Sequence, residues 1–193
     1  SRWIAVGAHK RRLTLTADAS DWVSDSSELT TDPNDDLNNI QLINNQFITI
    51  GGLDTGLVMT SLDGQDWTEQ RHTQAGLTDM VFANGRAIAV GYEGRRTWSS
   101  DLWNWFENPA SKPVQYNAIA AGNDLIVAAG FDGVLSTSED GQDWKNHDGE
   151  YNILDIAFGN GVFIAVAQNT IISSIDGINW TPATSIAGVF QTL

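Results

Sequence analysis

The sequence predicts an all-β fold, a five-bladed β-propeller in which each blade is a four-stranded antiparallel sheet. Three observations carry this prediction. A short motif recurs five times, and its copies close on tryptophans spaced 45, 38, 39 and 36 residues apart: Trp22, Trp67, Trp105, Trp144 and Trp180. An apolar run precedes each copy, and Asn-Gly, a strong hairpin signal, separates pairs of apolar runs. Small sheets repeated at this period are typical of propellers.

The apolar runs are interpreted as the second strand of each blade, buried on both faces. They are Trp3–Gly7, Phe47–Gly51, Ala87–Gly91, Leu125–Ala129 and Phe163–Ala167. First strands precede four of these runs and end in a turn signal, as in Asp79–Gly85 and Asp155–Gly161, which end in Asn-Gly. Third strands follow at Leu57–Ser61, Val134–Ser138 and Ile171–Ser174, and each fourth strand begins at the motif tryptophan.

The two ends of the chain complement each other. The first repeat starts at a second strand, whereas Ile186–Leu193 is an apolar segment with no second strand after it. We therefore expect one domain, 1–193, whose ring closes when the C-terminal strand pairs beside Trp3–Gly7, which also hides two sheet edges. The polar insertion Ser24–Asn38 is expected to be a long surface loop. Because the chain begins at Ser1, a processed or excised segment is also expected.

The motif has a structural explanation. Its best copy, residues 60–67, reads Thr-Ser-Leu-Asp-Gly-Gln-Asp-Trp. An Asp at this place can accept hydrogen bonds from amides of the turn, Gly tolerates a positive φ, and Trp buries a large ring. The aspartates in this position are Asp18, Asp63, Asp101, Asp140 and Asp176. We interpret the motif as a structural turn rather than a catalytic or metal site.

The pattern Ser/Thr-x-Asp-Gly-x-x-Trp resembles the Asp-box of the sialidase-like, BNR-type propellers. The repeat as a whole is similar to bacterial propellers grouped with photosystem II assembly factors. This resemblance covers nearly all of the chain and implies the fold. It implies much less about function, because such boxes occur in glycosidases, lectins, assembly factors and surface proteins alike.

Composition limits the partner classes. The net charge of −14 opposes binding to nucleic acid and to anionic membranes, and no apolar run approaches the roughly 20 residues of a membrane helix. The chain has no cysteine, which excludes disulfides, zinc thiolate sites and thiol catalysis. No cofactor and no metal are expected. We expect a monomer outside the cytoplasm: secreted, periplasmic or on the cell surface.

The predicted topology gives each blade two sides. The box side carries the box turns and the Asn-Gly turns, and the loop side carries the loops after the second and fourth strands. Most basic residues, Lys145 among them, are assigned to the loop side, so a negative box side and a mixed, ligand-binding loop side are expected. The candidate ligand-binding residues are Tyr92, Glu93, Arg95, Arg96, Trp98, Phe131 and Asp132.

A second candidate is a ring of polar residues at the start of the first strands, near an axial channel: Asn39, Asp79, Asn117 and Asp155. Such oxygens suit water or a hard cation such as calcium. The competing interpretation, which we favour, is that they cap the backbone of their own strands. The acidic insertion lacks the glycine and the terminal glutamate of a calcium loop.

These patterns favour a non-enzymatic propeller that recognises a protein or a carbohydrate. A lectin with repeated sugar pockets between blades is one alternative. A sialidase-like or other glycoside hydrolase is another, for which Arg71, Arg95, Arg96 and Tyr92-Glu93, or the pair Asp79 and Asp155, are the available residues. No Ser-His-Asp arrangement, phosphate loop or metal-binding His pair is visible in the sequence.

Overall fold

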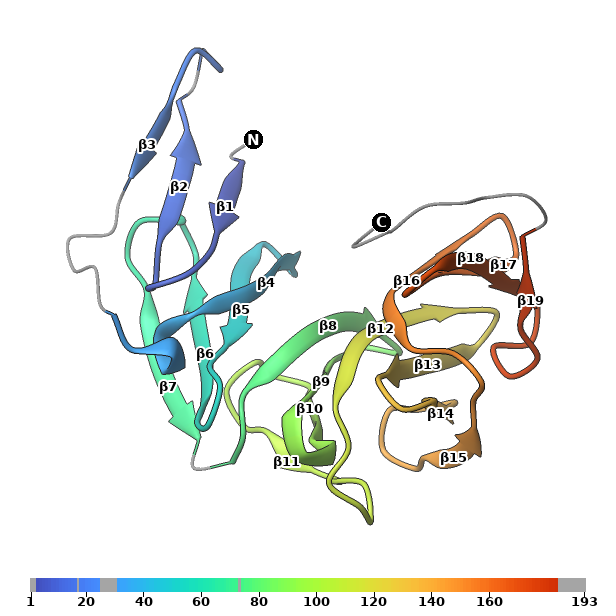
Figure 1. Cartoon of the computed structure of the whole chain (residues 1–193). Coiled ribbons are helices and arrows are strands. Elements are labelled where there is room, and N and C mark those ends of the chain that lie inside the picture. The colour runs from blue at the N-terminus through green and yellow to red at the C-terminus, as the bar shows by residue number, and fades with distance from the viewer. Residues whose placement is uncertain (1–2, 17, 25–30, 73, 184–193) are drawn as a thin grey trace. The chain divides into compact units, whose positions relative to one another are not determined.

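The computed structural model describes residues 3–16, 18–24, 31–72 and 74–183, which form antiparallel β-sheets in chain order (Figure 1). The chain divides into two compact units, Ser1–Thr78 and Asp79–Leu193, with the boundary at the start of a strand. No helix among the described residues is long and apolar enough to cross a bilayer. The expected all-β class is confirmed.

Unit 1 contains two sheets. The described part of the first has three strands, β1 (Ile4–Val6), β2 (Arg12–Leu15) and β3 (Trp22–Ser24). The second has four, β4 (Leu37–Ile43), β5 (Gln46–Gly51), β6 (Gly56–Ser61) and β7 (Thr68–His72), preceded by the 3-10 turn η1 (Pro33–Asp35).

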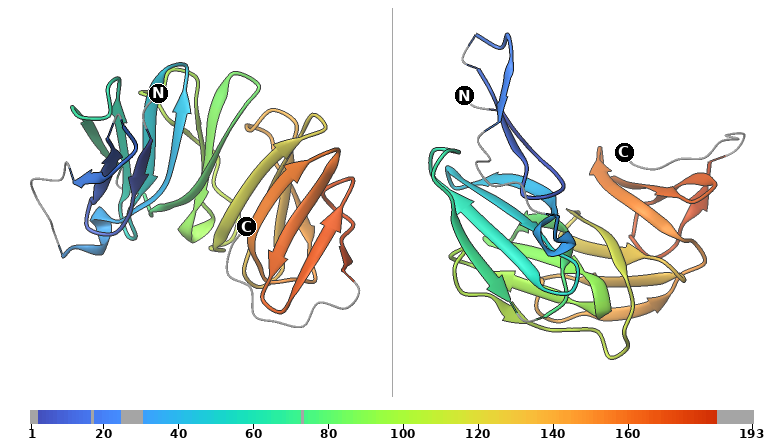
Figure 2. Two further views of the ribbon diagram at one scale, coloured as in Figure 1. Left: turned by 90° about the horizontal axis from the view of Figure 1, so that it is seen from above. Right: turned by 60° about the vertical axis from the view of Figure 1, so that its left-hand side comes forward.

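Unit 2 contains three four-stranded meanders, shown from two further sides in Figure 2. The first consists of β8 (Leu77–Ala83), β9 (Arg86–Gly91), β10 (Arg96–Ser99) and β11 (Phe106–Glu107), with the 3-10 turn η2 (Tyr92–Gly94) after β9. The second consists of β12 (Tyr116–Gly122), β13 (Leu125–Gly130), β14 (Val134–Ser138) and β15 (Lys145–Asp148). The third consists of β16 (Ile153–Gly159), β17 (Val162–Ala167), β18 (Thr170–Ser174) and β19 (Thr181–Pro182). The predicted order of four strands per repeat is confirmed in these sheets.

The Asn-Gly dipeptides make the predicted hairpins. Asn84 and Gly85 have φ values of 52° and 74°, and Asn160 and Gly161 have 51° and 81°. Two consecutive positive φ values define the type I′ turn, whose twist matches that of the strands on either side. Each dipeptide therefore fixes the pairing of the first strand with the second.

The second strands form the core, as their apolar runs predict. Ala87, Ile88, Ala89 and Val90 on β9 are all fully buried. Ile88 and Val90 pack in one cluster with Tyr116 and residues of β12 and β13, so the core lies between neighbouring sheets as well as within them. Strands β12 and β16 lie side by side, and their sheets share a second cluster that includes Val127 and Phe163.

The prediction for the insertion needs correction. Leu37 and Asn38 belong to β4, and Asp35 is only 7% exposed. Part of the segment is thus packed rather than a surface loop, because Asp35 is paired with cations from two other elements, as described below. The expected closing strand, Ile186–Leu193, lies outside the described residues.

Candidate functional site

The box motif closes a turn through its own side chains. Ser61 Oγ donates to Asp63 Oδ1 at 3.1 Å and accepts the N–H of Gly64 at 2.8 Å. The same Asp63 oxygen accepts the N–H groups of Gln65 and Asp66 at 2.9 and 3.0 Å. These bonds satisfy backbone donors that have no strand partner. The motif residues thus form a hydrogen-bonded turn in this sheet.

The same bonds recur around Asp140 and Asp176. Two degenerate boxes keep the carboxylate and lose the glycine. Asp101 Oδ1 accepts the N–H of Asn104 at 2.7 Å, with Leu102 at a φ of 62° in the glycine position. Around Asp18, Ala19 takes that position at a φ of 56°. The hydroxyl and the carboxylate are therefore sufficient to close the turn.

The turn bonds also lower the pKa of the aspartates. The pKa of Asp18 falls to about 2, chiefly because the Thr16 hydroxyl and then Ser20 donate to its carboxylate. The pKa values of Asp101 and Asp176 are also well below the usual range, because the backbone N–H of Asn104 and of Asn179, respectively, donates to each. At Asp140 burial is the largest single influence and would raise the pKa, yet the N–H donors of Asp143 and Gln142 keep this pKa low. These carboxylates are suited to holding a turn and not to exchanging protons at neutral pH.

Two box tryptophans of unit 2 pack on buried clusters. Trp144 joins the cluster of Ile88 and Val90 on the neighbouring sheet, and its Nε1 donates to the carbonyl of Gly141 at 3.1 Å. Trp180 packs on the cluster around Val127. Trp22, in the three-stranded sheet, is 45% exposed.

The loop side of unit 2 carries two matching turns. The N–H of Arg95 donates to the carbonyl of Tyr92 at 3.0 Å, and the N–H of Val134 donates to that of Phe131 at the same distance. Glu93 and Asp132, the residues after the aromatics, both have a φ near +55°. Phe131 is 38% exposed and Tyr92 is half-buried. The two turns thus share their backbone geometry, with an aromatic residue followed in sequence by a carboxylate.

Arg95 and Arg96 do not form the open surface patch that was expected around Trp98, because both side chains are buried. They are 3% and 4% exposed. Arg95 Nη2 pairs with Glu107 at 2.7 Å. Trp98 stacks on Phe106 with ring centroids 4.6 Å apart and packs on the buried cluster. These side chains are therefore packed rather than open to a ligand, because Glu107 pairs with Arg95 and Phe106 stacks on Trp98.

Arg96 is buried among neutral partners. Its Nε donates to the carbonyl of Asn108 at 3.0 Å, and its Nη1 donates to Asn146 Oδ1 at 3.0 Å. The guanidinium lies 5.3 Å from the ring centroid of Trp144 and 6.0 Å from that of Tyr116. Burial lowers its pKa, an effect that the Tyr116 hydroxyl partly opposes.

The proposed polar ring needs a correction of register. In β12, Ala118 pairs with Ala129, as Asn39 pairs with Ile50 and Asp155 with Val166. Asn117 lies in the bulge before that position and donates to the carbonyl of Ile153 at 2.8 Å. The same bulge lies between Leu37 and Asn39 and between Ile153 and Asp155, so Asn117 corresponds to Asn38, whose Nδ2 likewise donates to a carbonyl, that of Leu77, at 2.8 Å.

The aspartates of that set bind backbone. Asp79 accepts the N–H of Met80 and, across the sheet boundary, that of Ile119, both at 2.8 Å. Asp155 accepts the N–H of Ile156 at 2.8 Å. Among the described residues, no group of three or more His, Cys, Asp or Glu side chains has a metal-binding arrangement.

Sequence reasoning missed an ion network in unit 1. Lys10 Nζ lies 3.3 Å from Asp35 Oδ1 and 2.9 Å from Glu69 Oε2. Arg71 pairs with the same Asp35 oxygen and, through Nε, with Glu69 Oε1 at 2.7 Å. Although partial burial opposes it, pairing raises the pKa of Arg71. Asp35 of the acidic insertion is therefore paired with Lys10, in the turn between β1 and β2, and with Arg71 on β7.

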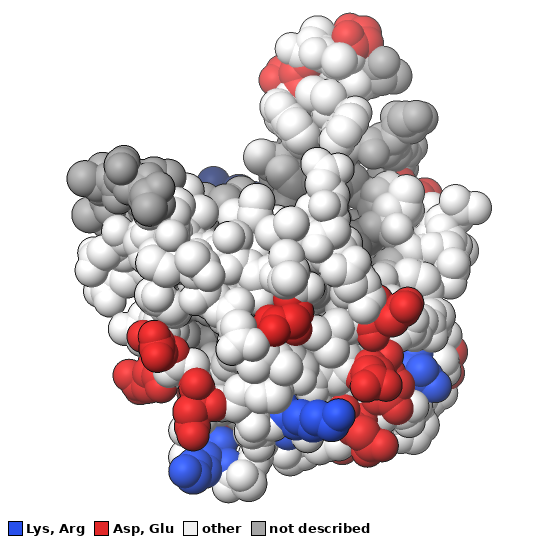
Figure 3. Space-filling model, turned by 90° about the vertical axis from the view of Figure 1, so that its right-hand side faces the viewer, with Lys and Arg blue, Asp and Glu red and all other residues white. Residues whose placement is uncertain are grey.

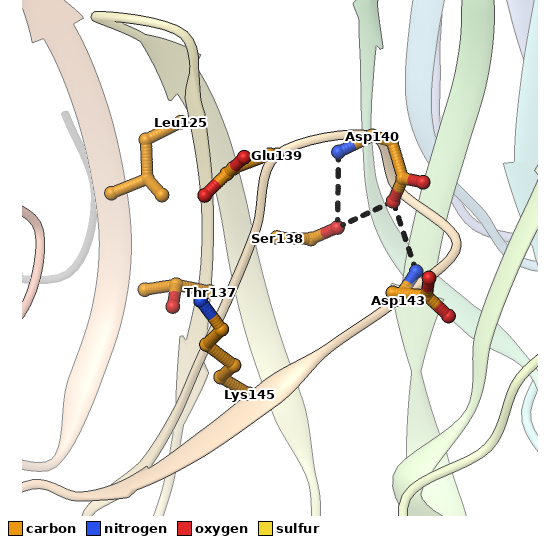
Figure 4. A pocket seen from close by; sticks show the side chains of 7 residues that line it. All are labelled: Leu125, Thr137, Ser138, Glu139, Asp140, Asp143 and Lys145. Atoms are coloured by element: carbon orange, nitrogen blue, oxygen red, sulfur yellow. Dashed lines mark hydrogen bonds between the residues drawn. The ribbon is translucent and has the colours of Figure 1, made fainter.

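Two cavities in unit 2 are lined by box or hairpin turns. One of about 290 Å³ is lined by Leu125, Thr137, Glu139, Asp143 and Lys145 together with the box residues Ser138 and Asp140 (Figure 4). Lys145 is thus beside a box turn and not on the loop side, because it directly follows Trp144. The side of the molecule in Figure 3 carries Asp and Glu with Lys and Arg beside them. Sequence could have pointed to Glu139, which stands where other boxes carry Leu62 and Ile175.

Repeated four-stranded meanders closed by these turns define a propeller-type all-β repeat protein. No protein-family model and no curated protein matches the chain. Among solved structures it is similar to one described as "YCF48 bound to D1 peptide", with 18% identity and a TM-score of 0.68 over 93% of this chain and 62% of that one. The chain therefore spans less than two thirds of that protein.

Two other structures share the fold. YCF48 from Cyanidioschyzon merolae has 13% identity and a TM-score of 0.67, covering 96% of this chain and 70% of that one. The computationally designed Ika4 protein has 17% identity and a TM-score of 0.56, covering 72% and 89%. At these identities the likeness shows the fold alone.

Proposed function

We propose that the chain is a non-enzymatic scaffold that recognises a segment of another protein. The observation that carries this proposal is the fold similarity to a structure solved with a bound peptide. The expected Asp-box class is part of the same proposal, and the turn geometry around Asp63, Asp140 and Asp176 supports it.

The hydrolase alternative lacks its machinery among the described residues. A sialidase-like site needs arginines that face the substrate, whereas Arg95 is paired with Glu107 and Arg96 is enclosed by neutral groups. A two-carboxylate mechanism needs an acid and a base directed at the sugar. Asp79 and Asp155 instead accept hydrogen bonds from the backbone of their own and a neighbouring strand.

A carbohydrate ligand is the second candidate, and one observation favours it. The turns at Tyr92-Glu93 and Phe131-Asp132 have equivalent backbone geometry, and in each an aromatic residue is followed directly by a carboxylate. A lectin would use such pairs repeatedly. Phe131 and Asp132 are the exposed pair, so they are the first positions to test.

The proposed function is tested on a library of defined short peptides, with a glycan array run in parallel on the same protein. A protein-segment scaffold binds a subset of the peptides with related sequences and leaves the glycan array unlabelled. Glycan binding that Phe131→Ala removes would establish the lectin alternative instead. Sugar release from sialoside or arabinan substrates would overturn the non-enzymatic assignment.

Closure of the ring is also a proposal. The described part of the first sheet has three strands, and the sequence supplies one more apolar segment at 186–193. If this segment completes the sheet beside β1, its deletion exposes a sheet edge and lowers the free energy of unfolding. A deletion variant as stable as the full chain in urea would refute closure.

A further inference from the structure

Two adjoining cavities on the box side of unit 2 share Leu125. The first, of about 290 Å³, has Glu139 and Lys145 on its walls, and the second, of about 270 Å³, has Asn84 and Asp124. We call the two together the Leu125 groove. In Figure 4 the Glu139 side chain extends toward Leu125, whereas Lys145 extends toward Thr137. The groove thus combines an apolar residue at its middle with charged walls.

Side-chain hydrogen bonds connect the turns of neighbouring sheets around the groove. Asn84 Nδ2 donates to the carbonyl of Glu139 at 2.7 Å, which joins the hairpin turn of β8 and β9 to the box turn after β14. Asn123 Nδ2 donates to the carbonyl of Gly161 at 3.1 Å, which joins two hairpin turns. A groove built on such fixed turns needs little reorganisation on binding, and this favours affinity.

The carboxylates of the groove are available to a partner. Asp140 already accepts the amides of its turn. The side chains of Asp124, Glu139 and Asp143, in contrast, have no hydrogen bond or ion pair within the part of the chain that the structure describes. Lys145 is the basic residue in the lining of the two cavities, so the negative charges there outnumber the positive one.

We propose that the Leu125 groove binds an extended segment of a partner protein that places a Lys or Arg side chain beside Glu139 and an apolar side chain on Leu125. This inference rests on the proposed function and names the chemistry of its ligand. Charge complementarity selects the occupant, because a cation gains from the three carboxylates and an acidic segment is repelled by them. The net charge of −14 adds long-range attraction for the same class of partner.

The test uses two capped, fluorescein-labelled peptides, one alternating leucine with lysine and one with glutamate in place of each lysine. Binding to the intact chain is followed by fluorescence anisotropy. We expect the leucine–lysine peptide to bind more weakly as sodium chloride rises, and the glutamate peptide not to bind. Glu139→Gln should weaken binding about threefold, as expected for one exposed ion pair, and Glu139→Gln with Asp143→Asn about tenfold.

The matched control is Asp54→Asn, which removes the same charge from an exposed carboxylate of unit 1. It should leave the affinity unchanged within about 1.5-fold. Equal weakening by Asp54→Asn and Glu139→Gln would mean that net charge alone attracts the peptide and would overturn the groove. Binding of the glutamate peptide, or no binding of either peptide, would also overturn it. The proposed function would still stand if the defined library yields other ligands.

Discussion

The Cδ1 methyl of Ile88 on β9 lies 2.5 Å from the position that a Cβ on Gly141 would occupy in the box turn after β14. Val127 and Gly177 repeat this relationship between the next two sheets, at 2.6 Å, and Ile4 and Gly64 repeat it in unit 1. The glycine of the box therefore has two functions. It permits the positive φ, and it lets one sheet's turn rest on the second strand of the sheet before it.

Gly141→Ala should cost about 2–4 kcal/mol of the free energy of unfolding. About 1 kcal/mol comes from alanine at a φ of 77°, and the rest from the clash with Ile88. Gly85→Ala is the matched control, because Gly85 has a φ of 74° and no atom lies within 4 Å of the place where its Cβ would be. It should cost about 1 kcal/mol in urea unfolding. Equal losses in the two variants would contradict the packing role.

Stability should fall at acid pH because the box aspartates have lowered pKa values in the folded state. A lowered pKa adds stability above the unfolded value, and that stability is lost as pH falls through the folded value. For Asp18 the loss runs from about 3.8 down to about 2. Urea midpoints measured from neutral pH to pH about 2 test this. Asp18→Asn should make the decline shallower, and an unchanged decline would argue against its contribution.

Asp35→Asn should destabilise unit 1 by about 2 kcal/mol, because Lys10 and Arg71 lose the carboxylate that they share at a site 7% exposed. Asp54→Asn serves as the control, since it removes an exposed carboxylate, and should change stability by less than about 0.5 kcal/mol. A double-mutant cycle with Arg71→Ala, measured by urea unfolding, should show coupling of about 1 kcal/mol. Additive losses would exclude a direct pair.

Arg96→Leu should be tolerated far better than Arg96→Ala. Strand pairing puts Arg96 opposite Val90, and the equivalent residue is Leu135, opposite Ala129, in the next sheet. Leucine refills most of the space without a buried charge, so we expect a loss below about 1.5 kcal/mol. Alanine leaves a cavity beside Trp144 and should cost about 3 kcal/mol. Similar losses in both variants would show that the guanidinium hydrogen bonds, not the volume, matter most.

Local chemistry explains why the strands and boxes were predictable. The hairpin at Asn84-Gly85 and the box turn around Asp63 form through φ angles and hydrogen bonds of residues that are consecutive in the sequence. A short sequence pattern is therefore enough to predict them. Asn117 was misplaced because the residue in the equivalent position of β12 is Ala118, which has no polar side chain, and the Asn beside it resembles the missing member of the set. Only strand pairing reveals the offset, because Ala118 pairs with Ala129 as Asn39 pairs with Ile50 and Asp155 with Val166.

Exposure was harder to predict than position. Arg95 and Arg96 are two adjacent basic residues, and such a pair in a sequence usually indicates an exposed surface patch. Their burial depends on Glu107, Asn108 and Asn146, which lie 12 to 50 residues away in the chain. Asp35 is buried for the same kind of reason, since Lys10 and Arg71 come from other elements.

The sequence by itself determined the repeat, the order of strands within it, the Asn-Gly hairpins and the hydrogen-bonded box turns, because these features depend on periodicity and on contacts within a few residues. Only the tertiary structure decided which charged groups are buried, which are paired and where cavities open. Those properties depend on packing between sheets, and the free energy of a charge is set by the partners and the solvent that packing leaves around it.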